Sequence, residues 1–336
     1  MKFHYEFDIR RSPATVHHRQ KLMLMGSCFT ENIGEKLRKH KFSVMENPHG
    51  ILFNPVSVAE AIDAYISNKH TTQDDIFEYN ETWHSWKHHS RFSGITAEDC
   101  LQKINQSTAT AHNYLKHADH LLITLGSAWL YTLTDQAVNA IPGSVAANNH
   151  KAPAGWFRKR LMDATETAAL LGTMLAKLFS FNPELQVIFT ISPVRHLREG
   201  VIENNRSKAV LIQAVHQLAE QFEQLYYFPA YELVIDDLRD YRFYSEDLVH
   251  PNYQATQYVW EKFVGACMEE DTRELMKEIA EINLAHHHKP FNASTTHHKH
   301  FLERYLAKTR LLQEKHPYLL FEEEIQYFEK GSRSEV

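Results

Sequence analysis

Short apolar runs alternate along the chain with stretches in which apolar residues recur every three or four positions. The first pattern predicts buried strands and the second predicts amphipathic helices. Strands are predicted at 22–25, 42–45, 121–125, 187–191 and 232–235. Helices are predicted at 31–40, 57–67, 165–181, 207–225 and 254–268. This alternation favours an α/β fold, with a mostly parallel sheet and helices on both of its faces.

Three of the predicted strands end in small or polar residues. The ends read Gly26-Ser27-Cys28, Gly126-Ser127 and Ser192-Pro193. In open α/β sheets, sites lie just beyond the carboxyl ends of the strands. We therefore expect the chemistry at these three ends.

The pattern changes at about residue 270. Helices are predicted at 271–284 and 301–314, joined by a polar stretch, and no further strand is indicated. The sequence thus predicts an α/β domain over 1–270 and a C-terminal helical extension over 271–336.

Charge and cysteine content exclude several classes of protein. The 336 residues carry 36 basic and 42 acidic side chains, a net charge of −6, which argues against a nucleic-acid or anionic-membrane surface. Three cysteines at these spacings fit neither a disulfide framework nor a zinc site. Charged residues near the start and the lack of a 20-residue apolar run predict a soluble, cytoplasmic protein with no membrane partner.

The turn after the first strand offers two nucleophiles. Gly26 permits a tight turn, and Ser27 and Cys28 follow it at the start of a predicted helix. Unpaired N–H groups at a helix N-terminus favour an anion there. On this motif alone, a helix cap at Ser27 and a small buried Cys28 explain the residues better than a nucleophile does.

A second motif precedes the last α/β helix. Asp247 and His250 are three residues apart, so that the carboxylate can hold one imidazole nitrogen while the other acts as a base. By itself this spacing is weak, because the chain has 23 histidines.

A nucleophile turn after the first strand and Asp-x-x-His before the last helix together resemble the SGNH (GDSL-type) hydrolases. The run from Gly26 to Thr30 is similar to the name motif of one branch, the GSCFA family, with Thr30 in place of alanine. Further stretches that resemble this family lie at 47–55, 124–128, 148–151, 192–196 and 237–244.

The resemblance implies a three-layer α/β/α, flavodoxin-like fold and acyl transfer through an enzyme nucleophile. In the register of the superfamily the nucleophile is Cys28, whereas a shift of one residue makes it Ser27, and both remain candidates. His250, oriented by Asp247, would be the base. No cofactor and no metal are implied.

The resemblance also implies residues that stabilise the oxyanion and contact the substrate. Gly50 suits the first donor of the superfamily. The second donor, an asparagine, is replaced by Ala128, so another group must substitute. Candidates for the oxyanion or substrate contacts are Ser127, Asn148, His150, His196, His84 and Arg195.

The sequence therefore favours an esterase or deacylase acting on a small-molecule or carbohydrate acyl ester. The alternatives are an inactive SGNH-fold binding or scaffold protein, and a cysteine-based thioesterase, amidase or acyltransferase. The histidine runs 286–288 and 297–300 are poor metal sites, because neighbouring residues on a helix point in different directions. The oligomeric state is left open.

Overall fold

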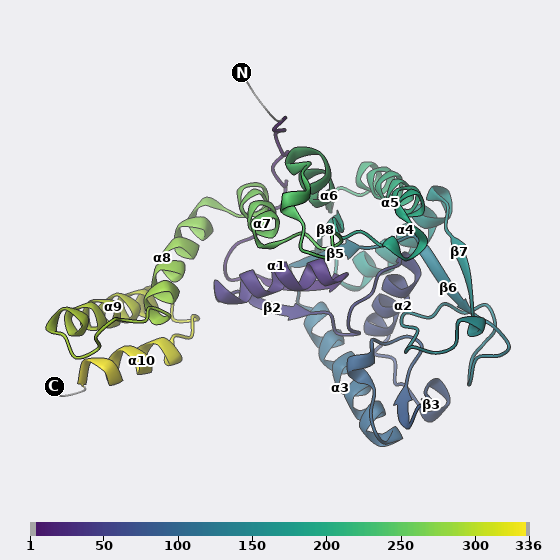
Figure 1. Ribbon diagram of the computed structural model, residues 1–336, viewed down its shortest axis with the longest axis horizontal. Helices are drawn as coiled ribbons and strands as arrows, with labels where there is room; N and C mark the ends of the chain where they lie inside the picture. The colour runs from purple at the N-terminus through teal and green to yellow at the C-terminus, as the bar shows by residue number, and fades with distance from the viewer. Residues whose placement is uncertain (1–4, 334–336) are drawn as a thin grey trace.

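The computed structural model describes residues 5–333 and has an α/β domain followed by three helices (Figure 1). Five parallel strands form the central sheet, in the order β2-β1-β5-β8-β9. They are β1 (Lys21–Gly26), β2 (Ser43–Glu46), β5 (His120–Leu125), β8 (Gln186–Ile191) and β9 (Leu225–Tyr227). This is the flavodoxin-like strand order, in which ligands bind beyond the strand ends where the order reverses, here between β1 and β5. The predicted fold class is confirmed.

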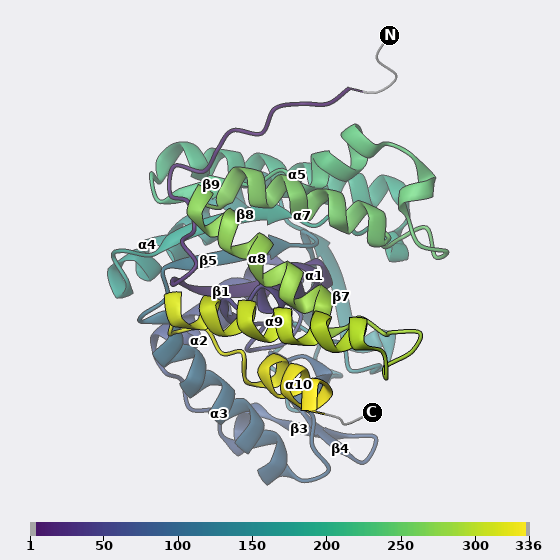
Figure 2. The same ribbon diagram turned by 90° about the vertical axis from the view of Figure 1, so that its left-hand side faces the viewer.

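Helices cover both faces of the sheet (Figures 1 and 2). Alternate residues of β1 point to opposite faces, so that Leu22 and Leu24 join one apolar cluster while Met23 and Met25 join the other. The first face is covered by α1 (Cys28–Lys39) and α7 (Tyr253–Cys267). The second face is covered by α2 (Pro55–Ile66), α3 (Ala97–Leu115), α4 (Ala164–Phe181) and α5 (Val201–Gln221).

The predicted strand at 232–235 is wrong. That segment forms the end of α6 (Ala230–Glu232) and a π-helical turn, η5 (Leu233–Leu238), and the last strand, β9, lies before it. Leu233 and Val234 are fully buried in the same apolar cluster as α7. A short apolar run fits a buried strand and a buried helical turn equally well, and packing against α7 decides between them.

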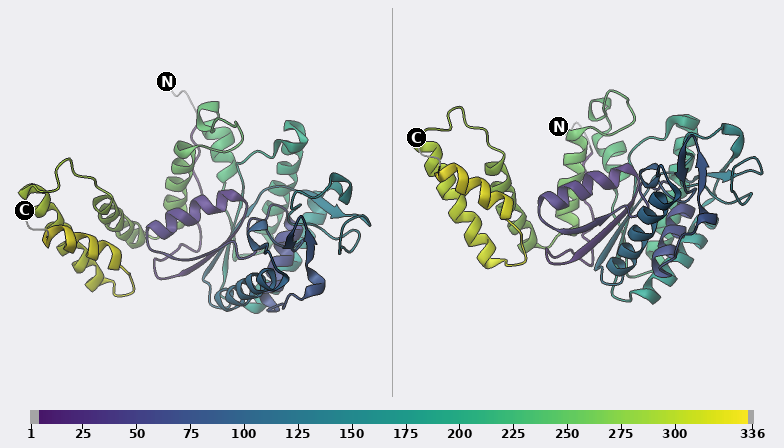
Figure 3. Two further views of the ribbon diagram at one scale, coloured as in Figure 1. Left: turned by 60° about the horizontal axis from the view of Figure 1, so that its bottom comes forward. Right: turned by 90° about the horizontal axis from the view of Figure 1, so that it is seen from below.

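Two small hairpins were not predicted. They are β3 (Phe77–Tyr79) with β4 (Thr82–His84), and β6 (Trp129–Leu133) with β7 (Phe157–Leu161). Both lie on the side of the α/β domain that faces away from the C-terminal helices (Figures 1 and 3).

The C-terminal helices form a separate layer with its own apolar cluster. They are α8 (Glu270–His286), α9 (Thr296–Lys315) and α10 (Glu322–Arg333), of which α10 was not predicted. Their buried residues include Leu275, Ile279, Ile282, Leu302, Leu312 and Phe328. Against the α/β domain, Lys41 Nζ lies 2.7 Å from Glu324 Oε1. No helix within residues 5–333 is long and apolar enough to cross a membrane.

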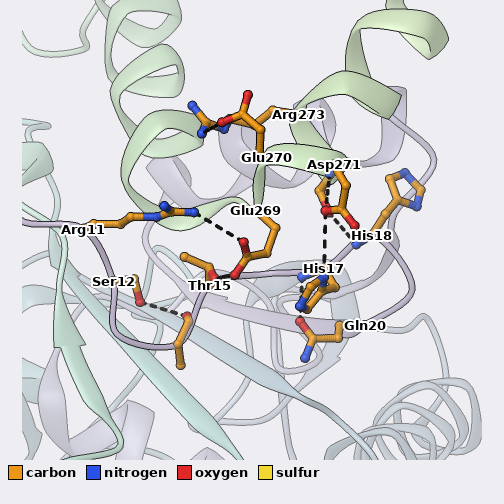
Figure 4. A network of polar contacts seen from close by, with 12 residues as sticks. Arg11, Ser12, Thr15, His17, His18, Gln20, Glu269, Glu270, Asp271 and Arg273 are labelled. Carbon is orange, nitrogen blue, oxygen red and sulfur yellow. Dashed lines mark hydrogen bonds and ion pairs between the residues drawn. The ribbon is translucent and has the colours of Figure 1, made fainter.

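The N-terminal segment runs along the junction between α7 and α8 (Figure 4). Thr15 Oγ1 donates a hydrogen bond to the Glu269 carboxylate, and the His18 N–H donates to Thr272 Oγ1 at 3.1 Å. Val16 is fully buried and bridges to Met268. Residues 15–18 are thereby fixed to residues some 250 positions later.

Candidate active site

The turn after β1 is shaped by a close approach of two strands. Gly26 has φ +130°, and a Cβ there would lie 2.1 Å from the Thr124 carbonyl oxygen of β5. The Gly26 N–H donates to Asn47 Oδ1 at 2.9 Å, and the Ser27 N–H donates to Thr124 O at 3.1 Å. Glycine is required at this position by both backbone conformation and space.

The two nucleophile candidates differ in exposure. Ser27 is 0 % exposed and is the N-cap of α1, where its Oγ accepts a hydrogen bond from the Phe29 N–H. Cys28 is the first residue of α1 and is partly exposed. Burial, and next the charge of Glu31, raise the pKa of the Cys28 thiol, so a base is needed to form the thiolate. Ser27 therefore caps α1, and Cys28 is the more exposed of the two candidates.

The Asp247–His250 pair is formed. His250 Nδ1 lies 2.6 Å from Asp247 Oδ2, and Asp247 Oδ1 accepts the N–H groups of Val249 and His250 at 2.9 and 3.0 Å. These hydrogen bonds, led by the His250 N–H, lower the pKa of Asp247 to about 2, so the carboxylate is ionised at neutral pH. With Nδ1 bound to the carboxylate, Nε2 of His250 is the nitrogen left for proton transfer.

Arg195 holds the loop that carries this pair. Its N–H donates to Val249 O at 3.1 Å, and its guanidinium lies 4.1 Å from the centre of the Tyr244 ring. Arg239 and Arg242, which precede the loop, pair with Asp236 and Asp240. The loop is therefore attached to the segment after β8.

Lys208 reaches the carboxyl ends of β5 and β8, where His196 also lies. Lys208 Nζ donates to Gly126 O and Ser192 O, each at 2.7 Å. Burial, and then the charges of Lys208 and His250, lower the pKa of His196 to about 3. The charge of Lys208 also acts on Cys28, where it lowers the thiol pKa against the larger effects of burial and Glu31.

A cleft with a volume of about 230 Å³ lies beyond the carboxyl ends of β5 and β8. It contains three of the predicted substrate residues, Ser127, Asn148 and His196. The lining also includes Phe53, Asn54, Trp129, Tyr131, Asn149, Arg198 and Glu199. No residue of α8–α10 lines this cleft.

Three other predicted residues are occupied elsewhere. The Gly50 N–H donates to Asn47 O at 2.7 Å, so in this conformation it is not free to bind an oxyanion. His84 and His150 pack together with ring centres 4.5 Å apart, and neither lines the cleft. His84 Nδ1 is hydrogen-bonded to Ser93 Oγ, and His150 Nε2 to Ser85 O.

The start of α5 contributes residues that the sequence analysis missed. Asn204 Oδ1 accepts the His196 N–H at 2.9 Å, and Ser207 Oγ accepts the Ala128 N–H at 2.7 Å. Together with Lys208, they form a buried polar row on a helix whose later turns are apolar. Polar residues at spacings of three and four before an apolar stripe were the available signal.

The described part of the chain contains no group of three or more His, Cys, Asp or Glu side chains placed to hold a metal ion. In the histidine run at 286–288, His286 and His288 instead contact the aromatic rings of Tyr327 and Phe301.

Several solved structures are similar to this chain at low identity. A family 3 carbohydrate esterase from Clostridium thermocellum is 12 % identical, with a TM-score of 0.36, over 78 % of this chain and 99 % of that one. An acetyl xylan esterase from Butyrivibrio proteoclasticus is 11 % identical, with a TM-score of 0.37, over 74 % of this chain and 63 % of that one. A carbohydrate esterase from Talaromyces cellulolyticus is 10 % identical, with a TM-score of 0.33, over 78 % of this chain and 99 % of that one.

No curated protein sequence matches the chain. Two family models do. Residues 279–333, within α8–α10, match the C-terminal domain of GSCFA domain proteins. Residues 21–263, from β1 through most of α7 and so including the whole candidate site, match the GSCFA family model, and the chain belongs to the GSCFA family.

Proposed function

We propose that this chain is an acyl-ester hydrolase whose nucleophile is Cys28 and whose base is His250, oriented by Asp247. The observation that carries the proposal is the partial exposure of Cys28 at the N-terminus of α1, together with the 2.6 Å Asp247–His250 pair. A nucleophile, a base and a group that orients the base are the parts that acyl transfer requires.

The chemistry follows from these groups. His250 Nε2 takes the proton from the Cys28 thiol, and the thiolate attacks the ester carbonyl carbon. The tetrahedral intermediate collapses when the leaving alkoxide takes the proton back from His250, which leaves a thioester on Cys28. Water, deprotonated by His250, then releases the acid and restores the thiol.

The oxyanion donors of this proposal are the Cys28 N–H at the start of α1 and the side-chain amide of Asn148. The helix N-terminus favours negative charge at the first position. Asn148 Oδ1 accepts the His150 N–H at 2.9 Å, which leaves the amide nitrogen as the donor. These groups would replace the Gly50 N–H, which is bound within its own turn, and the asparagine absent at Ala128.

An O-acylated carbohydrate is the proposed substrate class. The cleft combines polar side chains such as Asn148 and Asn149 with the aromatic residues Trp129 and Tyr131. Such a lining suits a ligand with hydroxyl groups and apolar ring faces. A cysteine nucleophile is equally compatible with thioester substrates, so thioesters belong in the same assay.

The test is hydrolysis of p-nitrophenyl acetate and of an acetyl thioester by the full chain and three variants. We expect Cys28→Ala and His250→Ala each to reduce kcat/KM by about 100-fold or more, the scale of nucleophile and acid–base contributions. Ser27→Ala is expected to retain activity while it costs about 1 kcal/mol of stability through loss of the N-cap.

Activity that survives in Cys28→Ala but is lost in Ser27→Ala, with both variants folded, would assign the nucleophile to Ser27. No turnover of either ester by the folded wild-type chain would favour the alternative of an inactive scaffold.

A further inference from the structure

Lys208 is a buried lysine without a carboxylate partner in residues 5–333. It is 1 % exposed, and its Nζ is bound to two carbonyl oxygens at 2.7 Å, those of Gly126 and Ser192. A buried ammonium is costly unless another group compensates its charge. Among the described residues, Cys28 is the group whose charge raises the pKa of Lys208 against the effect of burial.

The strand register places both residues at the same edge of the sheet. Gly26 of β1 pairs with Thr124 of β5, so Cys28 and Gly126 each lie two residues beyond that pair. Leu125 pairs with Ile191 of β8, which brings Gly126 and Ser192 together at the same edge of the sheet. Lys208 reaches this edge from α5, on the face of the sheet opposite α1.

We propose that Lys208 is a positioning residue whose ammonium, fixed by the Gly126 and Ser192 carbonyls, stabilises the thiolate of Cys28. The proposal rests on the proposed role of Cys28 as nucleophile. When the thiol ionises below pH 7, the Sγ–H bond breaks and the proton passes to His250 Nε2 or to solvent, while Lys208 keeps its own protons. The charge of Lys208 therefore offsets part of the cost of forming the thiolate.

Other titratable groups of the described residues also act on Cys28 and Lys208 or lie beside them. Glu31, on α1, acts on Cys28 in the opposite direction, because its negative charge raises the thiol pKa. His196 lies beside Gly126 and stays neutral above about pH 3, since burial lowers its pKa. The Tyr231 ring lies 5.9 Å from Lys208 Nζ and carries no charge near neutral pH. His250, hydrogen-bonded to Asp247, is the base of the proposed mechanism.

The proposal has a specific pH signature. Burial lowers the pKa of Lys208 to about 7, so its charge is present below that pH and is lost above it. Below pH 7 the thiolate fraction should rise tenfold per pH unit, helped by the ammonium. Above pH 7 the thiol and the amine share a single proton, so the thiolate fraction should stay nearly constant until the thiol itself titrates.

The experiment measures the rate at which methyl methanethiosulfonate modifies the full chain between pH 5.5 and 9, followed by intact mass. Cys100 and Cys267 are fully buried with raised pKa values, and Cys28→Ser identifies any signal from them. We expect the logarithm of the wild-type rate to flatten near pH 7. Lys208→Gln should react about 10-fold more slowly at pH 6, because an opposite charge at short range shifts a pKa by about one unit or more. This difference should disappear about one unit above pH 7.

Three controls separate the role of Lys208 from other effects. His250→Ala should keep the flattening if Lys208 causes it, and Lys177→Gln, which removes an exposed lysine, should react like the wild type. If Lys208→Gln fails to fold, the wild-type and His250→Ala profiles still decide the question, since they require no change at Lys208.

A wild-type rate that rises without flattening, or that flattens only when His250 is present, would overturn the proposal. So would a folded Lys208→Gln variant whose profile superimposes on that of the wild type. The measurement uses no ester, so it stands or falls separately from the hydrolase activity.

Discussion

Buried histidines are the residue-scale feature of this chain that most affects its response to pH. His49, His120 and His150 are each less than 10 % exposed. Desolvation lowers the pKa of His49 to about 3 and those of His120 and His150 to about 4. In the unfolded chain these groups titrate near 6.5. Between pH 4 and 6.5 the unfolded state thus binds more protons than the folded state.

We predict that the chain loses stability as the pH falls below 6.5. The contribution of the neutral buried histidines to the free energy of unfolding is fully present above that pH and is lost as the pH falls toward 4. At pH 5.5 the loss is about 1 kcal/mol per buried histidine. Urea unfolding at pH 7.5 and 5.5 measures it. His120→Gln should reduce the loss by about 1 kcal/mol, whereas His297→Gln, at an exposed position, should leave it unchanged. Equal losses in all three chains would contradict this account.

The residues of the site were partly readable from the sequence. The Gly26-Ser27-Cys28 turn and the Asp247–His250 spacing are local patterns, and each is formed as a local structure. Lys208 and Ser207 could not be identified in the same way, because their role depends on the strand ends that α5 crosses. The sequence also left Ser27 and Cys28 unresolved, since their exposure is set by the packing of α1.

At the scale of elements, the connection from β1 to α1 is tightly constrained by the backbone of β5. Gly26 combines a positive φ with a Cβ position already occupied by the Thr124 carbonyl. Gly143 has φ +88° but no atom within 4 Å of its Cβ position. Substitution of each glycine by alanine therefore separates the cost of backbone strain, which both positions share, from the cost of a steric clash, which only Gly26 has.

Gly143→Ala is expected to destabilise the chain by about 1–2 kcal/mol through backbone strain alone. Gly26→Ala should cost at least about 2 kcal/mol more, because β1 and β5 must move apart to admit the methyl group. Chemical denaturation of both variants measures the difference. Similar costs for the two would show that β5 yields easily at Thr124.

Elements with a long periodic pattern were predictable, and those fixed by packing were not. Helix α4 matches its apolar spacing closely, because its stripe faces the sheet. The segment around Val234 reads as a strand but forms a helical turn against α7, and β9 takes the edge of the sheet instead. The β6–β7 hairpin lines the cleft with Trp129, yet its strands are half exposed and give a weak pattern.

At the scale of the whole molecule, the C-terminal helices contact the α/β domain through apolar and polar groups: Met276 of α8 is buried in the cluster beneath α1 and α7, and Glu324 forms an ion pair. Glu324 on α10 is 5 % exposed and pairs with Lys41, which follows α1. The Lys41 ammonium also lies 4.9 Å from the centre of the Phe321 ring. In a partly buried ion pair between two layers, removal of one partner is destabilising, because the charge that remains has little access to water.

Glu324→Gln should lower the free energy of unfolding by about 1–2 kcal/mol, because Lys41 then loses its partner within the interface. Asp63→Asn, which breaks an exposed pair with Lys177, should cost about 0–1 kcal/mol. Adding Lys41→Met to Glu324→Gln should restore part of the loss. Urea unfolding of the four chains measures these values, and equal effects of the two single changes would show that the pair is not part of a desolvated contact.

The attachment of the N-terminal segment to α8 has a consequence for synthesis. Thr15 and His18 bond to Glu269 and Thr272, each 254 positions later in the chain. At about 5–20 residues per second, roughly 13–50 s of translation separate the two halves of these contacts. During that interval β1 and β5 can already pair, whereas the surface that Val16 covers beside Met268 stays open. Thr15 and His18 thus reach their final places only after the start of α8 has been synthesised.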